Sequence, residues 1–165
     1  MLNLSLSRSA LLVVVACAAV IGTAFFIQYV LGYAPCSLCL KQRVPYYAGM
    51  GLGALAFMLA LAEQPGLARA ALGITGLAML AGAGIAVYHA GVEWKFWTGP
   101  TECALTTPPA LGNLGDMMKD LTRNRIVPCS EPPFRILGIS PAGANVPVSL
   151  VFALFCLRAA WRRTG

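Results

Sequence analysis

Four long apolar runs alternate with polar segments along the chain. They cover residues 10–31, 44–62, 70–92 and 136–157, and none contains Lys, Arg, Asp or Glu. Each run is close to the roughly 20 residues that a helix needs to cross a bilayer. Since Pro141 and Pro147 disfavour an early start of the last helix, we expect helices over 10–31, 44–62, 70–90 and 143–160. The pattern predicts a single-domain all-α membrane protein over residues 1–165, a four-transmembrane-helix bundle.

The first run also has features of a cleaved signal peptide. Residues 14–17, Val-Val-Ala-Cys, resemble a lipoprotein cleavage box. The run nevertheless continues far beyond Cys17, whereas the apolar part of a signal peptide has about 7 to 15 residues. We therefore interpret it as an uncleaved first helix.

In the second run, Gly49 and Gly53 stand at the GxxxG spacing that lets two helix backbones approach closely in lipid.

Two polar loops, residues 32–43 and 91–142, lie on one side of the expected bundle. The longer loop holds apolar residues at helical spacing among charged ones: Leu111, Leu114, Met117, Met118 and Leu121. This pattern favours a short amphipathic helix on the membrane surface. The alternative is a small helix that covers an apolar core within the loop.

Composition and charge fit a membrane protein. Hydrophobic residues make up 58% of the chain and charged residues 11%, against about a quarter charged in soluble domains. The net charge of +6 comes from cations that flank apolar runs, so we expect no nucleic-acid partner, which requires a basic face in polar surroundings. With both termini cytoplasmic, the cytoplasmic side holds Glu63 and five arginines, as the positive-inside rule favours. These arginines are Arg8, Arg69, Arg158, Arg162 and Arg163.

This orientation places four cysteines outside the cytoplasm, namely Cys36, Cys39, Cys103 and Cys129. In a bacterium this location is the oxidising periplasm. The C-x-x-C spacing of Cys36 and Cys39 puts two sulfurs within disulfide reach, and a nearby cation or helix N-terminus lowers the pKa of a thiol. A loop pair and a membrane-surface pair can exchange electrons through a mixed disulfide. Electrons then need an acceptor that resides in the membrane, which indicates a quinone. Cys17 and Cys156 lie within apolar runs, where cysteine usually acts as a small buried hydrophobe.

Two further residues are candidates for quinone contact. Arg43 follows Cys39 by four residues, so on a helix that begins before Pro45 the two share a face, and its guanidinium stays charged at any working pH. The alternative is an arginine that anchors the helix end. His89, near the end of the third run, is a candidate for hydrogen bonding to a quinone carbonyl or for proton transfer. The alternative is an interfacial anchor.

We expect no metal site, because Cys103 and Cys129 lack the close spacing of a structural zinc pair.

The chain resembles the DsbB family of bacterial disulfide bond formation proteins in several motifs along nearly its whole length. These are Cys36-Ser37-Leu38-Cys39 followed by Gln42-Arg43, Tyr88-His89-Ala90-Gly91-Val92-Glu93, Cys103, and Cys129 followed by Leu137-Gly138-Ile139-Ser140. The resemblance implies a protein of the bacterial inner membrane that reoxidises the periplasmic thiol oxidase DsbA and passes electrons to ubiquinone or menaquinone. Ala144 precedes Asn145 where the family usually has an aromatic residue.

The resemblance also implies a role for each cysteine. Cys103 corresponds to the loop cysteine that forms the mixed disulfide with DsbA, and Cys129 to its loop partner, which then pairs with Cys36. Cys39 corresponds to the cysteine whose thiolate contacts the quinone ring, beside Arg43. We expect resting Cys36–Cys39 and Cys103–Cys129 pairs, with a Cys36–Cys129 bridge as an intermediate.

Two other functions are alternatives. A four-helix scaffold with purely structural loop disulfides would contain the same cysteines. A relative of the vitamin K epoxide reductase type would also be a quinone-linked four-helix bundle, but its C-x-x-C belongs inside a late helix.

Overall fold

The computed structural model describes residues 5–99, 125–126, 129–132, 134–135 and 138–162. Its long helices are α1 (Leu6–Phe25), α2 (Ser37–Leu61), α3 (Pro65–Glu93) and α5 (Pro141–Trp161). A π-helix, η1 (Phe26–Val30), continues α1, and two short strands, β1 (Tyr33–Ala34) and β2 (Arg125–Ile126), pair in parallel. The four helical segments, with η1 counted as part of the first, are each long and apolar enough to cross a membrane. The predicted four-helix membrane architecture is confirmed, and the cytoplasmic position of the termini stays a prediction.

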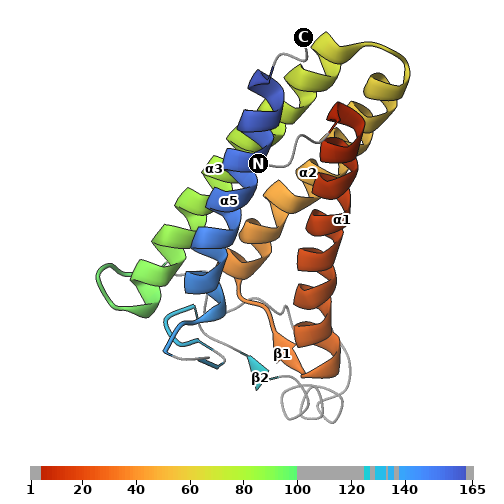
Figure 1. Cartoon of the computed structure of the whole chain (residues 1–165). Coiled ribbons are helices and arrows are strands. Elements are labelled where there is room, and N and C mark those ends of the chain that lie inside the picture. Colours follow the sequence, from red (N-terminus) through yellow and green to blue (C-terminus); the bar gives the residue numbers. More distant parts are fainter. Residues whose placement is uncertain (1–4, 100–124, 127–128, 133, 136–137, 163–165) are drawn as a thin grey trace, which may run out of the picture.

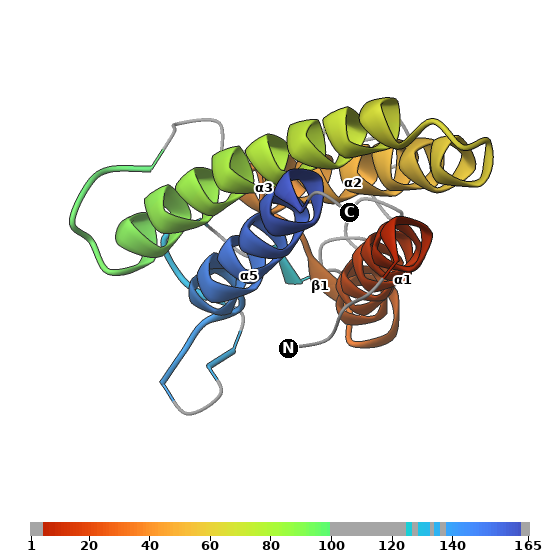
Figure 2. The same ribbon diagram turned by 45° about the horizontal axis from the view of Figure 1, so that its top comes forward.

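The helices pack in a simple order. α1 lies against α2, α2 against α3, and α3 against α5 (Figure 1). Figure 2 shows α3 running alongside both α2 and α5, with α1 beside α2. The start of α1, the turn between α2 and α3, and the end of α5 share one end of the bundle, and η1, β1 and the start of α2 lie at the other (Figure 1). The amphipathic helix expected around residues 111–121 falls outside the described residues.

Helix α2 begins at Ser37, well before the residue 44 at which its apolar run begins. Cys36 is the N-cap, and its sulfur accepts a hydrogen bond from the backbone N–H of Cys39 at 3.3 Å. Such a bond satisfies one of the donors that a helix start leaves free. The segment that we expected to be a loop up to residue 43 is therefore partly helical, and Cys39 lies in the first turn of α2.

Two other helices also begin before the residues we expected. α3 starts at Pro65 rather than residue 70, with proline in the first turn, where its missing N–H costs no helical bond. α5 starts at Pro141 rather than residue 143, because Ser140 caps it by accepting the N–H of Gly143 at 3.0 Å. At α5 the Ser140 cap, which hydropathy does not detect, sets the boundary, whereas the N-cap of α3, Gln64, makes no side-chain cap hydrogen bond.

The core is densest where small residues let helices meet. A Cβ on Gly49 would lie 2.9 Å from Cys17 Sγ, and a Cβ on Gly53 would lie 3.0 Å from Val14 Cγ2. The predicted close approach at this GxxxG pair is therefore present between α2 and α1. Cys17 and Cys156 are fully buried in this core.

Many large apolar side chains instead point outward from all four helices. Examples are Leu11, Val15, Leu55, Met58, Leu77, Val151 and Leu154. Exposed apolar surface on this scale suits a lipid environment, since soluble monomers rarely expose large contiguous apolar patches.

Candidate redox site at the start of helix α2

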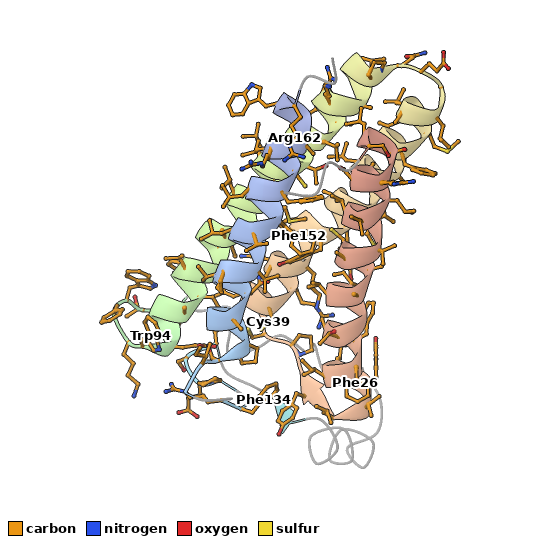
Figure 3. All side chains as sticks on the ribbon, in the orientation of Figure 1. Phe26, Cys39, Trp94, Phe134, Phe152 and Arg162 are labelled. Carbon is orange, nitrogen blue, oxygen red and sulfur yellow. The ribbon has the colours of Figure 1, made fainter. Side chains whose placement is uncertain are left out.

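The two cysteines of the C-x-x-C motif lie together at the bundle end that carries η1 and β1. Their sulfurs are 3.0 Å apart, and both cysteines are free thiols. This arrangement corresponds to the reduced dithiol, and the Cys36–Cys39 bond that we expect in the resting protein stays a prediction. Figure 3 shows Cys39 at the same end of the bundle as Phe26, Trp94 and Phe134, with Arg162 at the opposite end.

Cys36 is the thiol that this environment favours as a thiolate. The pKa of Cys36 is lowered to about 4, mainly by the hydrogen bond with the Cys39 side chain and less by His89 and the Cys39 amide, whereas burial opposes the change. The N-cap position contributes to the same effect, because the partial positive charge of a helix N-terminus stabilises an anion. Cys36 is 2% exposed, so this sulfur is protected from bulk solvent.

His89 on α3 lies beside this pair of cysteines. Its Nε2 lies 3.7 Å from Cys36 Sγ and 3.9 Å from Glu93 Oε1, one helical turn further along α3. The imidazole is buried. The three ligand atoms of Cys36, Cys39 and His89 all lie within 4.8 Å of one another. His89 is therefore close enough to exchange a proton with the dithiol.

A chain of buried and partly buried hydrogen bonds leads from His89 into the bundle. His89 Nδ1 contacts Gln42 Nε2 at 2.7 Å, and Gln42 Oε1 accepts from Asn145 Nδ2 at 2.7 Å. Asn145 Oδ1 accepts from the Tyr46 hydroxyl at 2.6 Å, and that hydroxyl contacts Ser149 Oγ at 3.0 Å. The chain links α3, α2 and α5.

The orientation of the Gln42 amide in this chain sets which nitrogen of His89 carries the proton. The Gln42 amide nitrogen faces Nδ1, so Nδ1 is the acceptor and the proton resides on Nε2. Nε2 is also the nitrogen that faces Cys36 and Glu93. The described arrangement therefore directs an N–H toward the dithiol.

Arg43 lies on the α1 side of α2. Its guanidinium donates to Gln28 Oε1 at 2.8 Å and to the Ala24 carbonyl at 3.4 Å, and it lies over the Phe25 ring at 5.3 Å. Gln28 belongs to η1, and π-helical turns often occur at functional sites. The side chain is half-buried and braced by α1, whereas Lys41, two residues earlier, is exposed.

Cys129 also packs beside the dithiol. It is buried, packs with Cys36, Leu38 and Val92, and places its sulfur 4.0 Å from Ser37 Oγ. Cys129 is disulfide-bonded, and its partner lies outside the described residues, as does Cys103. A loop disulfide is thus adjacent to the C-x-x-C pair.

Comparison with known proteins identifies the family. The model of the family "Disulfide bond formation protein DsbB" matches residues 7–159. The chain belongs to the DsbB family. It is 30% identical over 160 residues to disulfide bond formation protein B of Xanthomonas campestris pv. campestris, covering 91% of this chain and 87% of the relative. It is 40% identical over 129 residues to disulfide bond formation protein B 2 of Pseudomonas syringae pv. syringae, covering 76% and 71%.

A shorter match has higher identity. The chain is 44% identical over 88 residues to disulfide bond formation protein B of Chromobacterium violaceum, covering 52% of this chain and 51% of the relative. The match thus spans about half of that relative's length. No solved structure matches the chain. This DsbB-family chain is a disulfide bond formation protein of the membrane, with the free dithiol and the Cys129 disulfide at one end of its bundle.

Sequence reasoning missed several residues of this site. Glu93 was part of a family motif without an assigned role, yet it is buried beside His89. Its spacing of four residues from His89 was the available signal. Gln42 was likewise part of a motif without an assigned role, and Asn145, Tyr46 and Ser149 received no role. Tyr46 follows Gln42 by four residues on α2, so helical spacing was an available signal for it. Nothing in the sequence pattern places Asn145 and Ser149 beside Gln42, because their contacts depend on how α5 packs.

Proposed function

We propose that this chain is a quinone-dependent thiol oxidoreductase of the bacterial inner membrane, with its redox cysteines on the periplasmic side. It reoxidises a DsbA-like thiol oxidase. The observation that carries the proposal is the dithiol at the start of α2, which has a stabilised thiolate at Cys36 and the disulfide-bonded Cys129 packed against it. A purely structural pair of cysteines would not need a lowered pKa or a neighbouring disulfide.

Electrons enter through the loop pair in this scheme. A thiolate of reduced DsbA attacks the loop disulfide at Cys103, so one S–S bond forms as another breaks and Cys129 leaves as a thiolate. Cys129 then attacks Cys36 of an oxidised Cys36–Cys39 pair, which releases Cys39 as a thiolate. The second DsbA thiol resolves the mixed disulfide at Cys103, which frees Cys103 as a thiolate. Cys103 then attacks Cys129 and releases Cys36. The net result is oxidised DsbA, an intact loop pair and a reduced Cys36–Cys39 dithiol.

The residues around Cys39 fit a bound quinone. Cys39 is half-buried, and Leu40 and Val44 beside it expose apolar side chains toward lipid. Arg43 has five N–H donors, of which the described contacts to Gln28 and Ala24 engage two. When bound, a quinone accepts the two electrons and two protons that leave the dithiol as Cys36 and Cys39 reform their disulfide. Arg43 binds and orients the head group, and His89 transfers a proton at Nε2.

A quinone reduction assay on the purified full-length chain tests the proposal. Reduced DsbA is the electron donor, and water-soluble ubiquinone and menaquinone analogues are offered separately as acceptors. The parent should reduce at least one analogue, whereas Cys36→Ser and Cys39→Ser should abolish the reaction because neither can form the C-x-x-C disulfide. Cys156→Ser, which alters a buried cysteine of the core, is the matched control and should retain activity. Equal rates for the parent and Cys39→Ser would exclude the mechanism and favour the structural scaffold.

A further inference from the structure

Cys36, Cys39 and His89 form a cluster of metal-binding side chains, and Glu93, to which the proposed electron transfer assigns no role, lies beside His89. The two sulfurs and His89 Nε2 lie within 4.8 Å of one another. Thiolates and imidazole are the preferred ligands of zinc, with Zn–S near 2.3 Å and Zn–N near 2.0 Å. We propose that the reduced dithiol binds a zinc ion through Cys36, Cys39 and His89, with Glu93 as the fourth ligand.

The spacing of the ligand atoms suits tetrahedral coordination. At the usual bond lengths, tetrahedral zinc separates sulfur and nitrogen ligands by about 3.5–3.8 Å. Cys36 Sγ and His89 Nε2 are already 3.7 Å apart. The two sulfurs, at 3.0 Å, need to separate by less than about 1 Å to fit the same geometry. A small rotation of the Cys39 side chain supplies that change.

Glu93 provides an independent indication of a cation. Its Oε1 lies 3.9 Å from His89 Nε2, while its Oε2 is buried and has no hydrogen-bond partner among the described residues. Glu93 is 6% exposed. Burying an unpaired carboxylate oxygen is costly, and buried acidic groups are normally paired or bound to a metal. A zinc ion beside Nε2 would compensate this carboxylate as well as the two thiolates.

His89 can become a metal ligand without losing its second hydrogen bond. Zinc binding at Nε2 requires the proton to reside on Nδ1, which then needs an acceptor. Gln42 supplies this acceptor if its amide group flips, so that its oxygen faces Nδ1 in place of its nitrogen. The Asn145 amide can flip in the same way, so that its oxygen then faces the Gln42 nitrogen. The Tyr46 hydroxyl both donates and accepts, so it tolerates either direction.

Only the dithiol state can bind the ion in this way, because a Cys36–Cys39 disulfide offers no thiolate. Binding displaces the remaining thiol protons, so zinc affinity should rise with pH. Bound zinc also occupies both sulfurs and should block their oxidation. The inference does not depend on the proposed function, since it requires only free thiols and the described geometry.

The test is a zinc titration of the full-length chain in detergent without oxygen. The Cys103→Ser/Cys129→Ser background removes the loop thiols, and a chromophoric chelator competes for zinc. We expect one zinc per chain in the reduced protein and none in the oxidised protein. Cys36→Ser should abolish binding, His89→Ala should weaken it by roughly 100-fold and Glu93→Gln by about tenfold. Cys156→Ser, the matched cysteine control, should bind like the background.

Cobalt substitution reports the ligands directly. Bound Co²⁺ should show a thiolate charge-transfer band and the intense visible bands of tetrahedral coordination, both lost in Cys36→Ser. Circular dichroism of each variant shows whether it keeps its helices, and Cys39→Ser replaces Cys36→Ser if that variant unfolds. The inference is overturned if the reduced background binds no stoichiometric zinc, if binding survives loss of Cys36 or Cys39, or if the cobalt spectrum is octahedral. Quinone reduction is not measured here, so failure of the zinc site leaves the proposed function intact.

Discussion

His89 Nε2 on α3 lies 3.7 Å from Cys36 Sγ at the start of α2. This contact joins two helices that are distant in sequence and places an imidazole N–H against the sulfur that is favoured as a thiolate. The helix N-terminus, the Cys39 thiol and His89 act on the same atom. A low thiol pKa at Cys36 is therefore a property of the assembled bundle and not of the C-x-x-C motif alone.

The first prediction concerns the pH dependence of the Cys36 thiolate. The pKa of Cys36 is lowered from 9.0 to about 4, so the thiol is ionised above that value and becomes protonated only as the pH falls through it. In metal-free reduced protein with Cys103→Ser and Cys129→Ser, ultraviolet thiolate absorbance should persist at neutral pH and be lost in the acid range. Cys39→Ala removes the largest cause, the hydrogen bond from the Cys39 side chain, and should move this transition upward. A Cys36 transition near pH 9 in the parent background would contradict the prediction.

The second prediction concerns Arg43 and its neighbour in η1. Removing a charged hydrogen-bond donor costs about 1.5–3 kcal/mol, so Arg43→Met should raise the KM for quinone by roughly ten- to hundredfold. Gln28→Ala should raise the same KM by a smaller factor, because Gln28 only holds the guanidinium at 2.8 Å. Neither change should alter the KM for reduced DsbA. Lys41→Met removes the exposed cation of the same helix turn and is the control. Equal effects of Lys41→Met and Arg43→Met would exclude a specific role for Arg43.

The third prediction tests the polar chain in the bundle. Replacing Asn145 by Ala leaves Gln42 Oε1 without its described partner and removes one of the two partners of the Tyr46 hydroxyl, which keeps Ser149 Oγ. A buried polar group that loses its partner costs about 1–3 kcal/mol. We expect Asn145→Ala to lower the free energy of unfolding in detergent by that amount, and Gln42→Ala to show strong coupling with it in a double-mutant cycle. The exposed Leu154→Ala on the same helix should change stability by under about 0.5 kcal/mol. Additive effects at Gln42 and Asn145 would show that the chain does not act as a unit.

The sequence was sufficient to predict elements that depend on local pattern. Four apolar runs predicted four spanning helices, and the GxxxG spacing of Gly49 and Gly53 predicted close packing. The C-x-x-C spacing also predicted two adjacent sulfurs. Helix starts were less predictable, because Cys36 and Ser140 act as caps through single hydrogen bonds.

The contacts between helices could not be predicted in the same way. Placing Asn145 against Gln42 requires the rotation and depth of α5 relative to α2, and hydropathy determines neither. The burial of Glu93 likewise depends on what covers the end of α3. The family resemblance named the residues of several motifs, but the geometry that joins His89, Glu93 and the dithiol came from the structure.

The last prediction concerns Gly91, two residues before the end of α3. A Cβ there would overlap the Trp97 indole, so the indole would have to move. Trp97 stacks on Tyr88 with ring centroids 5.9 Å apart, and its Nε1–H donates to the Tyr88 carbonyl at 2.8 Å. Overpacking of this kind costs about 1–3 kcal/mol. Gly91→Ala should therefore destabilise the chain by that amount.

The fluorescence of Trp97 offers a direct readout of this packing. In a background where Trp97 is the only tryptophan, Gly91→Ala should shift the emission to longer wavelength, because the indole becomes more exposed. Gly84→Ala is the matched control on the same helix, since nothing lies within 4 Å of its Cβ position. It should leave the spectrum unchanged and stabilise α3 by up to about 1 kcal/mol, because alanine is the better helix former. An unshifted spectrum in Gly91→Ala would mean that Trp97 does not pack on α3 in the membrane protein, and that the end of α3 beside His89 and Glu93 is held by other contacts.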